Sequence, residues 1–286
     1  MNIGIIGNGF VGKAVKESFK NCFEVFIFDT DKRKANIKSL EELILKCKIT
    51  FLCLPTPMSL IDGSCHLGII EDTLKQINIY CDESDFYGNA KRTIVIKSTI
   101  PPGTTEKWNK EYKYIDIAFN PEFLTEVNSI DDFRNQNRII IGSTRKVGAK
   151  IKNIYSKVFP KVPIIKTSAT IAEMVKYFTN CFLAMKVSYA NEIYQICEKL
   201  NIDYDKVVEY AISDERIGTS HLNVPGPDGD YGFGGHCFPK DLNALIHLAE
   251  KQGLELDINV LKATLETNNK VRKNRDWERQ KGRAVI

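Results

Sequence analysis

Short apolar runs alternate with stretches of helical periodicity over the first 166 residues. Seven of these runs are rich in β-branched or aromatic residues and are typical of buried strands: NIGII, EVFIFD, ITFLCL, TIVIKS, YIDIAF, RIIIGS and VPIIK. Strands that alternate with helices favour a parallel sheet covered by helices. One helix has a start signal, because Ser39 precedes Glu42 at capping-box spacing. The pattern predicts an α/β domain over residues 1–168 with a mostly parallel sheet, and a polar surface loop over 81–92.

From Ala169 to about Leu200 the pattern becomes that of one long helix. Its apolar positions fall on or near a single stripe: Ile171, Met174, Val175, Phe178, Phe182, Met185, Tyr189, Ile193, Ile196 and Leu200. Further helices are expected over 204–212, over 239–252 and from 257, with a loop rich in Gly and Pro over 214–235. The prediction is an all-helical second domain, 169–270. This helix is longer than one small domain needs, so we expect a homodimer or a larger homo-oligomer.

Composition and charge narrow the functional classes. The chain of 286 residues is 43% hydrophobic and 27% charged, as in an ordinary globular protein with two domains. The net charge of +4 is mostly local, because residues 270–286 hold seven Lys or Arg. We expect residues 271–286 to form a basic, polar, solvated tail, and we expect no nucleic-acid partner. The chain has no run typical of a membrane span or a secretory signal, so the expected location is cytoplasmic, with no membrane partner.

The eight cysteines are scattered without CxxC pairs. This spacing argues against a disulfide framework and against a zinc site. Most of these thiols are expected to be small buried hydrophobic side chains. We therefore expect no metal.

A glycine-rich turn follows the first apolar run. Gly7, Gly9 and Gly12 have the GxGxxG spacing between a predicted strand and a predicted helix, which is typical of a Rossmann dinucleotide site. The next strand ends in Asp29, where a carboxylate can bind the adenosine ribose. A carboxylate there favours NAD over NADP, although the basic run 32–34 weakens that preference.

One cysteine stands apart from the others. Cys237 lies between the glycines at 232, 234 and 235 and Pro239, a residue suited to the first turn of a helix. At a helix N-terminus the thiolate is favoured over the thiol. Asp241, four residues on, could hold a water or orient a partner.

Two further patterns indicate a site. On the long helix Glu173, Lys176 and Asn180 share one face, opposite Phe178, and a surface salt bridge is the alternative interpretation. The segments KSTIPPGT and NPEFLTE each end a predicted strand, where ligands gather in open α/β sheets. Plain turns rich in proline are the alternative there.

Taken in order, GNGFVG, CLPTP, KSTIPPGT, NPEFLTE, AEMVKYFTN, DERIG and GFGGHCFPKD resemble the UDP-glucose/GDP-mannose dehydrogenase family over nearly the whole chain. The resemblance implies NAD as cofactor, a nucleotide sugar as substrate, and a helical dimerisation domain of the 6-phosphogluconate-dehydrogenase-like type. It implies oxidation of the sugar to a uronic acid, with UDP-glucose as the best guess. The implied route uses two NAD per sugar and passes through a thiohemiacetal and a thioester on Cys237.

The resemblance also implies roles for individual residues. The implied catalytic set is Cys237, Lys176, Asn180, Asp241, Glu126 and Thr99. The implied cofactor contacts are Gly7, Gly9, Phe10, Val11, Gly12, Asp29, Lys34, Pro55, Thr56, Thr99, Glu126 and Lys240. The implied substrate contacts are Glu122, Phe123, Leu124, Thr125, Glu126, Lys176, Asn180, Arg216 and Gly234. Arg216 would reach the neighbouring subunit's sugar site. Spacing alone does not choose between Glu126 and Asp241 as general base.

The chain also departs from the family pattern. Family members usually continue through a long helix into a third, nucleotide-binding domain, whereas here the helix leads into the polar ending RDWERQKGRAVI, so we expect that domain to be lacking. Thr125 stands where arginine or alanine is common. Two alternatives stay open: a single-step β-hydroxyacid-type dehydrogenase, and a non-catalytic NAD-binding homologue.

Overall fold

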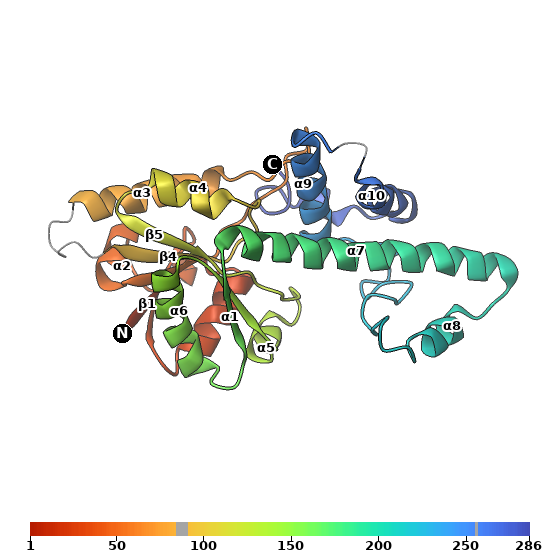
Figure 1. Cartoon of the computed structure of the whole chain (residues 1–286), viewed down its shortest axis with the longest axis horizontal. Coiled ribbons are helices and arrows are strands. Elements are labelled where there is room, and N and C mark those ends of the chain that lie inside the picture. The colour runs from red at the N-terminus through yellow and green to blue at the C-terminus, as the bar shows by residue number, and fades with distance from the viewer. Residues whose placement is uncertain (84–90, 255–256) are drawn as a thin grey trace. The chain divides into compact units, whose positions relative to one another are not determined.

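The computed structural model describes residues 1–83, 91–254 and 257–286 (Figure 1). The chain divides into two compact units, residues 1–56 with 67–176 and residues 57–66 with 177–286. Most of the loop expected over 81–92 lies outside the described residues. At its edges, residues 81–83 end a helix and Arg92 begins a strand.

The first unit is built on one seven-stranded sheet in the order β2-β1-β3-β4-β5-β6-β7. Its strands are β1 Asn2–Ile6, β2 Glu24–Phe28, β3 Ile49–Leu52, β4 Arg92–Ile96, β5 Ile115–Phe119, β6 Ile139–Gly142 and β7 Ile164–Thr167. All strand pairs are parallel except β5 with β6, where Phe119 pairs with Gly142 in antiparallel register. The predicted α/β class with a mostly parallel sheet is confirmed.

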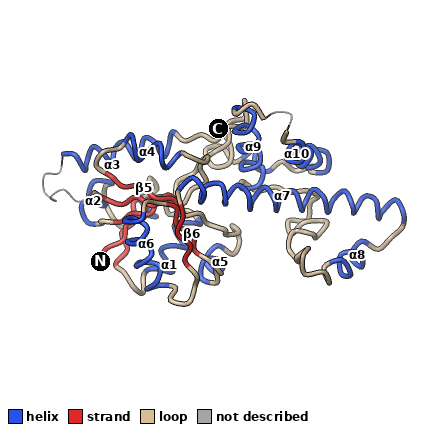
Figure 2. The backbone as a smooth tube through the Cα atoms, viewed as in Figure 1, coloured by secondary structure: helices blue, strands red, loops and turns tan. Residues whose placement is uncertain are grey.

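Helices cover both faces of this sheet, as Figure 2 shows in blue around the red strands. They are α1 Phe10–Phe19, α2 Leu40–Lys46, α3 Gly68–Glu83, α4 Thr104–Glu111, α5 Ser129–Arg134 and α6 Arg145–Val158. Alternate strand residues supply two cores, so Phe51 packs with Phe19 and Tyr155 while its neighbour Leu52 packs with Leu43 and Trp108. Ser39 accepts a hydrogen bond from the backbone N–H of Glu42 at 3.1 Å, which is the predicted cap of α2.

The long helix α7 spans Ala169–Leu200, as predicted. Its predicted apolar stripe is largely on the surface of the chain, since Phe178 is 69% exposed and Tyr189 is 61% exposed. The polar residues Glu173, Lys176 and Asn180 lie on the buried side instead. The surface salt-bridge interpretation of these three residues is therefore wrong.

The rest of the second unit is helical. It contains α8 Tyr204–Ala211, α9 Cys237–Lys251, α10 Asn259–Val271 and the 3₁₀ helix η3 Asp276–Arg279. Helix α9 begins two residues before the predicted start, at Cys237. Pro239 fits inside the first turn because the N–H that proline lacks would have no partner within the helix there.

The C-terminal segment 277–286 is not a solvated tail. Trp277, Ala284 and Val285 are buried in a small core with Met58. The backbone N–H of Met58 donates to the carbonyl of Ala284 at 2.7 Å, and that of Ile286 donates to the carbonyl of Met58 at 2.9 Å. Trp277 stands alone between two acidic residues and the apolar run 284–286 is only three residues long, so no local periodicity indicated that they are buried.

Candidate functional site

The glycine-rich turn after β1 is shaped by close contacts within the first unit. Gly7 has a φ of +89°, and a Cβ there would lie 2.5 Å from the carbonyl oxygen of Cys53. A Cβ on Gly12 would lie 1.9 Å from the carbonyl oxygen of Gly7, whereas a Cβ on Gly9 would meet no atom within 4 Å. Gly7 and Gly12 are thus required by the fold, and Gly9 leaves open space at the start of α1. Helix α1 has no side-chain cap and no acidic residue in its first turn, which suits a phosphate.

Asp29 lies beside this turn, at the end of β2. Its two carboxylate oxygens accept hydrogen bonds from the backbone N–H groups of Asn8 at 2.7 Å and Asp31 at 2.8 Å. The side chain of Asn8 donates to the carbonyl of Lys34 at 2.8 Å, so the backbone of Lys34 also lies beside the glycine-rich turn. The lysine side chain itself is exposed, with its Nζ 4.0 Å from Asp31.

The ends of β3 and β4 bring together the next pair of predicted residues. The hydroxyl of Thr56 donates to the carbonyl of Thr99 at 2.9 Å, and both residues are buried. The hydroxyl of Ser98 donates to the carbonyl of Leu54 at 2.5 Å, next to the half-buried Pro55. Strand order reverses between β1 and β3, and ligands of open α/β sheets bind at such a switch point.

Lys176 is buried in the first unit against the predicted segment 122–126. Its Nζ donates to the carbonyl of Glu122 at 2.5 Å and lies 3.2 Å from the Glu122 carboxylate. It also lies 5.3 Å from the centre of the Phe123 ring. The backbone N–H of Leu124 donates to the other Glu122 oxygen at 2.8 Å, so both charges of this pair are satisfied.

The remainder of that segment faces solvent. Thr125 and Glu126 are exposed, and the backbone N–H and the hydroxyl of Thr125 both donate to Asp132, at 2.7 and 2.6 Å. Lys176 is therefore brought to Glu122 and Phe123.

Sequence reasoning missed the buried Lys97, which lies two residues before Thr99 in KSTIPPGT. Its Nζ donates to the side-chain oxygen of Asn120 at 2.9 Å, and that oxygen also accepts from the Tyr155 hydroxyl. The Asn120 amide donates to the carbonyl of Ile140 at 2.6 Å, which connects the ends of β4, β5 and β6. Burial lowers the pKa of Lys97 to about 8. The signal in the sequence for this buried lysine was its position directly after an apolar strand.

In the second unit Cys237 is the first residue of α9 and is partly buried. Asp241, one turn later, is 1% exposed, and its two oxygens accept from Asn180 at 2.6 Å and from Lys240 at 2.5 Å. Burial alone would lower the pKa of Lys240, but the charge and hydrogen bond of Asp241 outweigh it and the pKa is raised. Four of the predicted residues, Asn180, Cys237, Lys240 and Asp241, thus meet at the start of one helix.

The loop before Cys237 is held by two helical asparagines that the sequence reasoning missed. The side-chain oxygen of Asn191 accepts from the Gly232 N–H at 3.1 Å. Asn268 accepts from the Phe233 N–H at 2.7 Å and donates to the Phe233 carbonyl at 3.1 Å. Asparagine is a poor residue for a helix interior, and that was the only local signal.

Arg216 lies apart from these groups. It is exposed, and its guanidinium pairs with Asp214, with the shortest contact at 2.5 Å.

Among the described residues no group of three His, Cys, Asp or Glu side chains could hold a metal ion. Within those same ranges, no helix combines the length and the apolar character that crossing a membrane requires.

Comparison with known proteins identifies the two parts of this arrangement. The family model "UDP-glucose/GDP-mannose dehydrogenase family, NAD binding domain" matches residues 35–159, and the model of the same family's central domain matches residues 170–270. The UDP-glucose 6-dehydrogenase TuaD of Bacillus subtilis is 35% identical over 250 residues, 85% of this chain and 50% of that protein. The UDP-glucose 6-dehydrogenase AglM of Haloferax volcanii is 31% identical over 94% of this chain and 70% of that protein.

A solved structure agrees with these matches. The UDP-glucose dehydrogenase from the hyperthermophilic archaeon Pyrobaculum islandicum is similar with a TM-score of 0.82 and 28% identity, over 94% of this chain and 68% of that one. The chain spans 50% of TuaD and 66% of a further curated relative, the UDP-glucose 6-dehydrogenase YwqF of Bacillus subtilis.

The glycine-rich turn generates a first prediction. Gly9→Ala should reduce NAD affinity at least about tenfold, because the added methyl group occupies space that only a ligand can use. It should change the free energy of unfolding by no more than about 0.5 kcal/mol, since φ is −74° and no atom lies within 4 Å. Gly12→Ala is the matched contrast and should destabilise the fold. Calorimetric titration with NAD and denaturant unfolding measure both effects, and normal NAD affinity in Gly9→Ala would contradict the assignment.

Lys97 generates a second prediction, on pH. Because its pKa is about 8 in the folded chain and 10.5 ordinarily, the unfolded chain binds more protons between these values. The contribution of Lys97 to stability should therefore rise with pH across this window. The free energy of unfolding of the unmodified chain minus that of Lys97→Met should increase from pH 7 to pH 10. Chemical denaturation measures it, with the exposed Lys48→Met as control, and a flat difference would rule out the buried lysine as the cause.

Proposed function

Because the chain belongs to the UDP-glucose/GDP-mannose dehydrogenase family, we propose that it oxidises the primary alcohol of a nucleotide sugar to a carboxylate with two NAD. UDP-glucose is the best candidate for the substrate. The curated relatives described above are named UDP-glucose 6-dehydrogenases, and the similar solved structure is that of a UDP-glucose dehydrogenase. The observation that carries the proposal is Cys237 as the first residue of α9, one turn before the buried Asp241. A single-step dehydrogenase has no use for a thiol in this position.

The first unit would bind the cofactor. Gly7, Gly9 and Gly12 would admit the diphosphate at the start of α1, and Asp29 would accept hydrogen bonds from the adenosine ribose. Thr56 and Thr99 would line the nicotinamide side. Bound NAD supplies a hydride acceptor twice in each reaction cycle.

The thiol would divide the four-electron oxidation into two two-electron steps. First the alcohol carbon would lose a hydride and the hydroxyl would lose its proton, which would give an aldehyde. The Cys237 thiolate then adds to the aldehyde carbon, and protonation of the oxygen gives a thiohemiacetal. This tetrahedral carbon would lose a second hydride while its hydroxyl loses a proton, which would give a thioester. Water breaks the carbon–sulfur bond, which releases the carboxylate and restores the thiol.

Lys176 and Asn180 would stabilise the oxygen that develops negative charge in these steps. Removal of one such donor typically reduces kcat by about 100-fold or more. Both side chains are held in place, Lys176 by Glu122 and Asn180 by Asp241. Both oxygens of Asp241 already accept a hydrogen bond. We therefore assign Asp241 to orienting Asn180 and Lys240, and water activation to the exposed Glu126.

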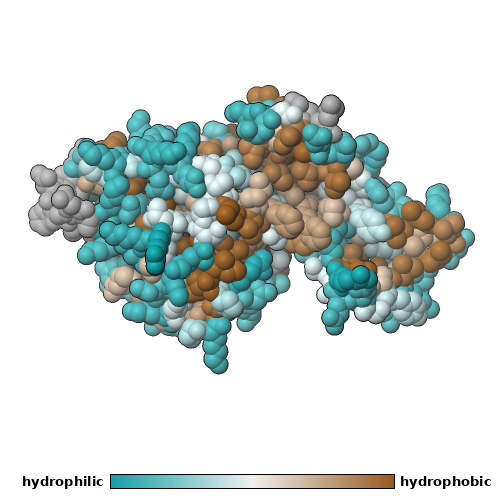
Figure 3. Space-filling model, in the orientation of Figure 1, coloured by the Kyte–Doolittle hydropathy of each residue, from teal (hydrophilic) through white to brown (hydrophobic). Residues whose placement is uncertain are grey.

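The second unit would also form a homodimer. Large apolar side chains of α7 are exposed, and Figure 3 shows hydrophobic surface along this helix. Phe178 and Phe182 stack with ring centres 6.3 Å apart, and Tyr189, Ile196 and Leu200 continue the surface. A contiguous apolar stripe of this kind suits an isologous contact between two copies of the chain. Arg216 would then reach the sugar site of the partner.

The test of the activity is to offer NAD with a panel of UDP- and GDP-sugars and to count NADH formed per sugar consumed. We expect two NADH per sugar. One NADH would indicate the single-step β-hydroxyacid-type alternative, and NAD binding without turnover would indicate a non-catalytic homologue.

Cys237→Ser should retain NAD affinity and lose net acid formation, because a serine hydroxyl at this position is a far weaker nucleophile than a thiolate. Calorimetry with NAD and chromatography of the sugar product measure the two properties. The exposed Cys22→Ser is the matched control and should behave as the unmodified chain does. Undiminished uronate from Cys237→Ser would refute the nucleophile assignment.

Sedimentation should find a dimer or larger assembly at micromolar concentration. Phe178→Glu should shift it toward the monomer, because the side chain is 69% exposed in the chain and a carboxylate would be buried in the contact. Val260→Glu on α10, 61% exposed, is the control and should leave the assembly unchanged. A monomeric unmodified chain would contradict the dimer.

A further inference from the structure

The turn that precedes Cys237 is tied to a carboxylate from the C-terminal segment. The backbone N–H of Gly235, two residues before Cys237, donates to both oxygens of Asp276, at 3.2 and 3.0 Å. Asp276 begins η3, and the two residues are 41 positions apart in the chain. Helix α9 has no side-chain hydrogen bond at its N-cap. The start of the helix that presents Cys237 is therefore fixed through the backbone before it.

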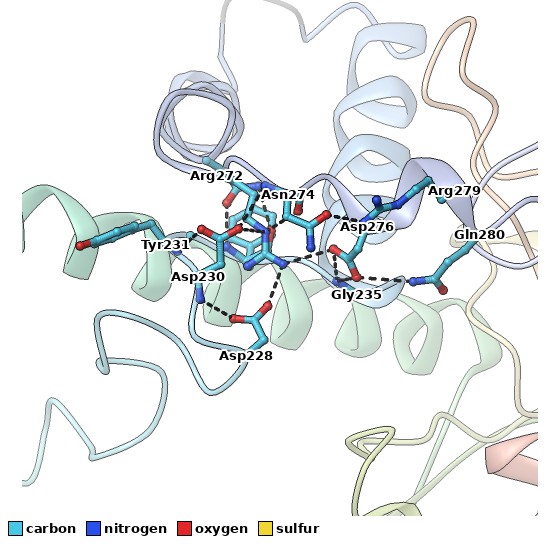
Figure 4. A network of polar contacts seen from close by, with 12 residues as sticks. Asp228, Asp230, Tyr231, Gly235, Arg272, Asn274, Asp276, Arg279 and Gln280 are labelled. Atoms are coloured by element: carbon cyan, nitrogen blue, oxygen red, sulfur yellow. Dashed lines mark hydrogen bonds and ion pairs between the residues drawn. The ribbon is translucent and has the colours of Figure 1, made fainter.

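Asp276 is in turn held by a buried arginine (Figure 4). The Arg272 side chain is 2% exposed, and its Nη2 lies 3.2 Å from Asp276 and 2.7 Å from Asp228. Its Nε donates to the carbonyl of Asn274 at 2.8 Å and lies 3.5 Å from Asp230. Nη2 and Nε thus meet acceptors from four residues while Nη1 has no hydrogen-bond partner, so the position of the buried guanidinium is set by several groups at once.

Gly234 is the point where this cluster touches the turn. A Cβ at position 234 would lie 2.2 Å from the Arg272 Nη2 and 2.4 Å from the Asp276 carboxylate. The absent side chain is what lets the charged groups approach the backbone. A glycine is needed here by the protein itself, and not only by a ligand.

We propose that Arg272 and Asp276 are positioning residues, which fix the Gly234–Gly235 turn and so hold Cys237 at the start of α9. Neither residue acts on the sugar. The inference rests on the proposed role of Cys237 as nucleophile. If the turn loosens, the first turn of α9 frays, and the thiolate loses the N–H groups that favour it over the thiol.

The test uses the full chain with Asp276→Ala. We expect kcat for the nucleotide sugar to fall about tenfold, as loss of a charge-assisted hydrogen bond would cause, with the NAD affinity unchanged. We also expect the pH midpoint of Cys237 alkylation by iodoacetamide to rise. Mass spectrometry of the labelled peptides reads each cysteine separately, so the exposed Cys22 serves as an internal reference that should not change.

Two further variants separate positioning from a general loss of fold. Asp276→Asn keeps an oxygen that can accept from Gly235 and should restore part of the rate and of the alkylation midpoint. Gly234→Ala keeps both charged side chains in the sequence but displaces them from the turn, and it should reproduce the Asp276→Ala effects. Glu278→Ala, in the same 3₁₀ helix and paired with Arg275 at the surface, is the matched control and should match the unmodified chain.

Three results would overturn the proposal: an unchanged alkylation midpoint in both Asp276→Ala and Gly234→Ala, no recovery in Asp276→Asn, or equal effects in Glu278→Ala. If Asp276→Ala does not fold, the results for Gly234→Ala and Asp276→Asn test the positioning role instead. The alkylation profile needs no substrate, so it tests the positioning role even if the unmodified chain turns over no nucleotide sugar. That last outcome would count against the proposed function alone.

Discussion

A buried charge is tolerated in a protein only where other groups hold it, and this constraint organises both units of the chain. Helix α7 has polar groups on its buried side. In the first unit Glu173 accepts hydrogen bonds from the backbone N–H groups of Gly103 and Thr105, at 2.6 and 2.9 Å, and so caps α4 from outside that helix. Burial raises the pKa of Glu173 although these donors oppose the shift. Lys176 fixes Glu122 after β5, and in the second unit Asn180 fixes Asp241 on α9. Three side chains of one helix thus hold the start of α4, the segment after β5 and the first turns of α9.

The same requirement accounts for the side of α7 that remains on the surface. The buried side of this helix carries these polar groups and mostly small apolar residues, and its large apolar side chains such as Phe178 and Tyr189 lie on the outside, where a second copy of the chain is the partner that we propose. It also accounts for the C-terminal segment, where the buried Arg272 pairs with Asp276 beside the glycine turn. A segment of many charges can therefore be ordered when some of those charges are buried and paired.

The proposed cofactor site and the proposed site of the nucleophilic thiol depend on different structural features. The cofactor half depends on backbone geometry: Gly7 and Gly12 permit close packing, and Gly9 leaves room for a ligand. The thiol half depends on side chains that restrain a helix start, with Asp241 on one side of Cys237 in the sequence and the Gly234–Gly235 turn on the other. The family match covers both halves, while the chain spans about half to two thirds of the length of the curated relatives it matches.

The sequence by itself determined the seven strands, the extent of α7, the glycine turn and the thiol near a helix start, because each is encoded by spacing within a few residues. Only the tertiary structure decided the antiparallel pairing of β6, the burial of Lys97 and Lys176, and the packing of Trp277 and Val285. It also decided that Gly234 makes room for Arg272 and Asp276, across 41 residues between Gly235 and Asp276. The physical reason is that periodicity tells which side of an element is apolar, whereas the partner of a buried polar group is chosen by contacts between distant parts of the chain.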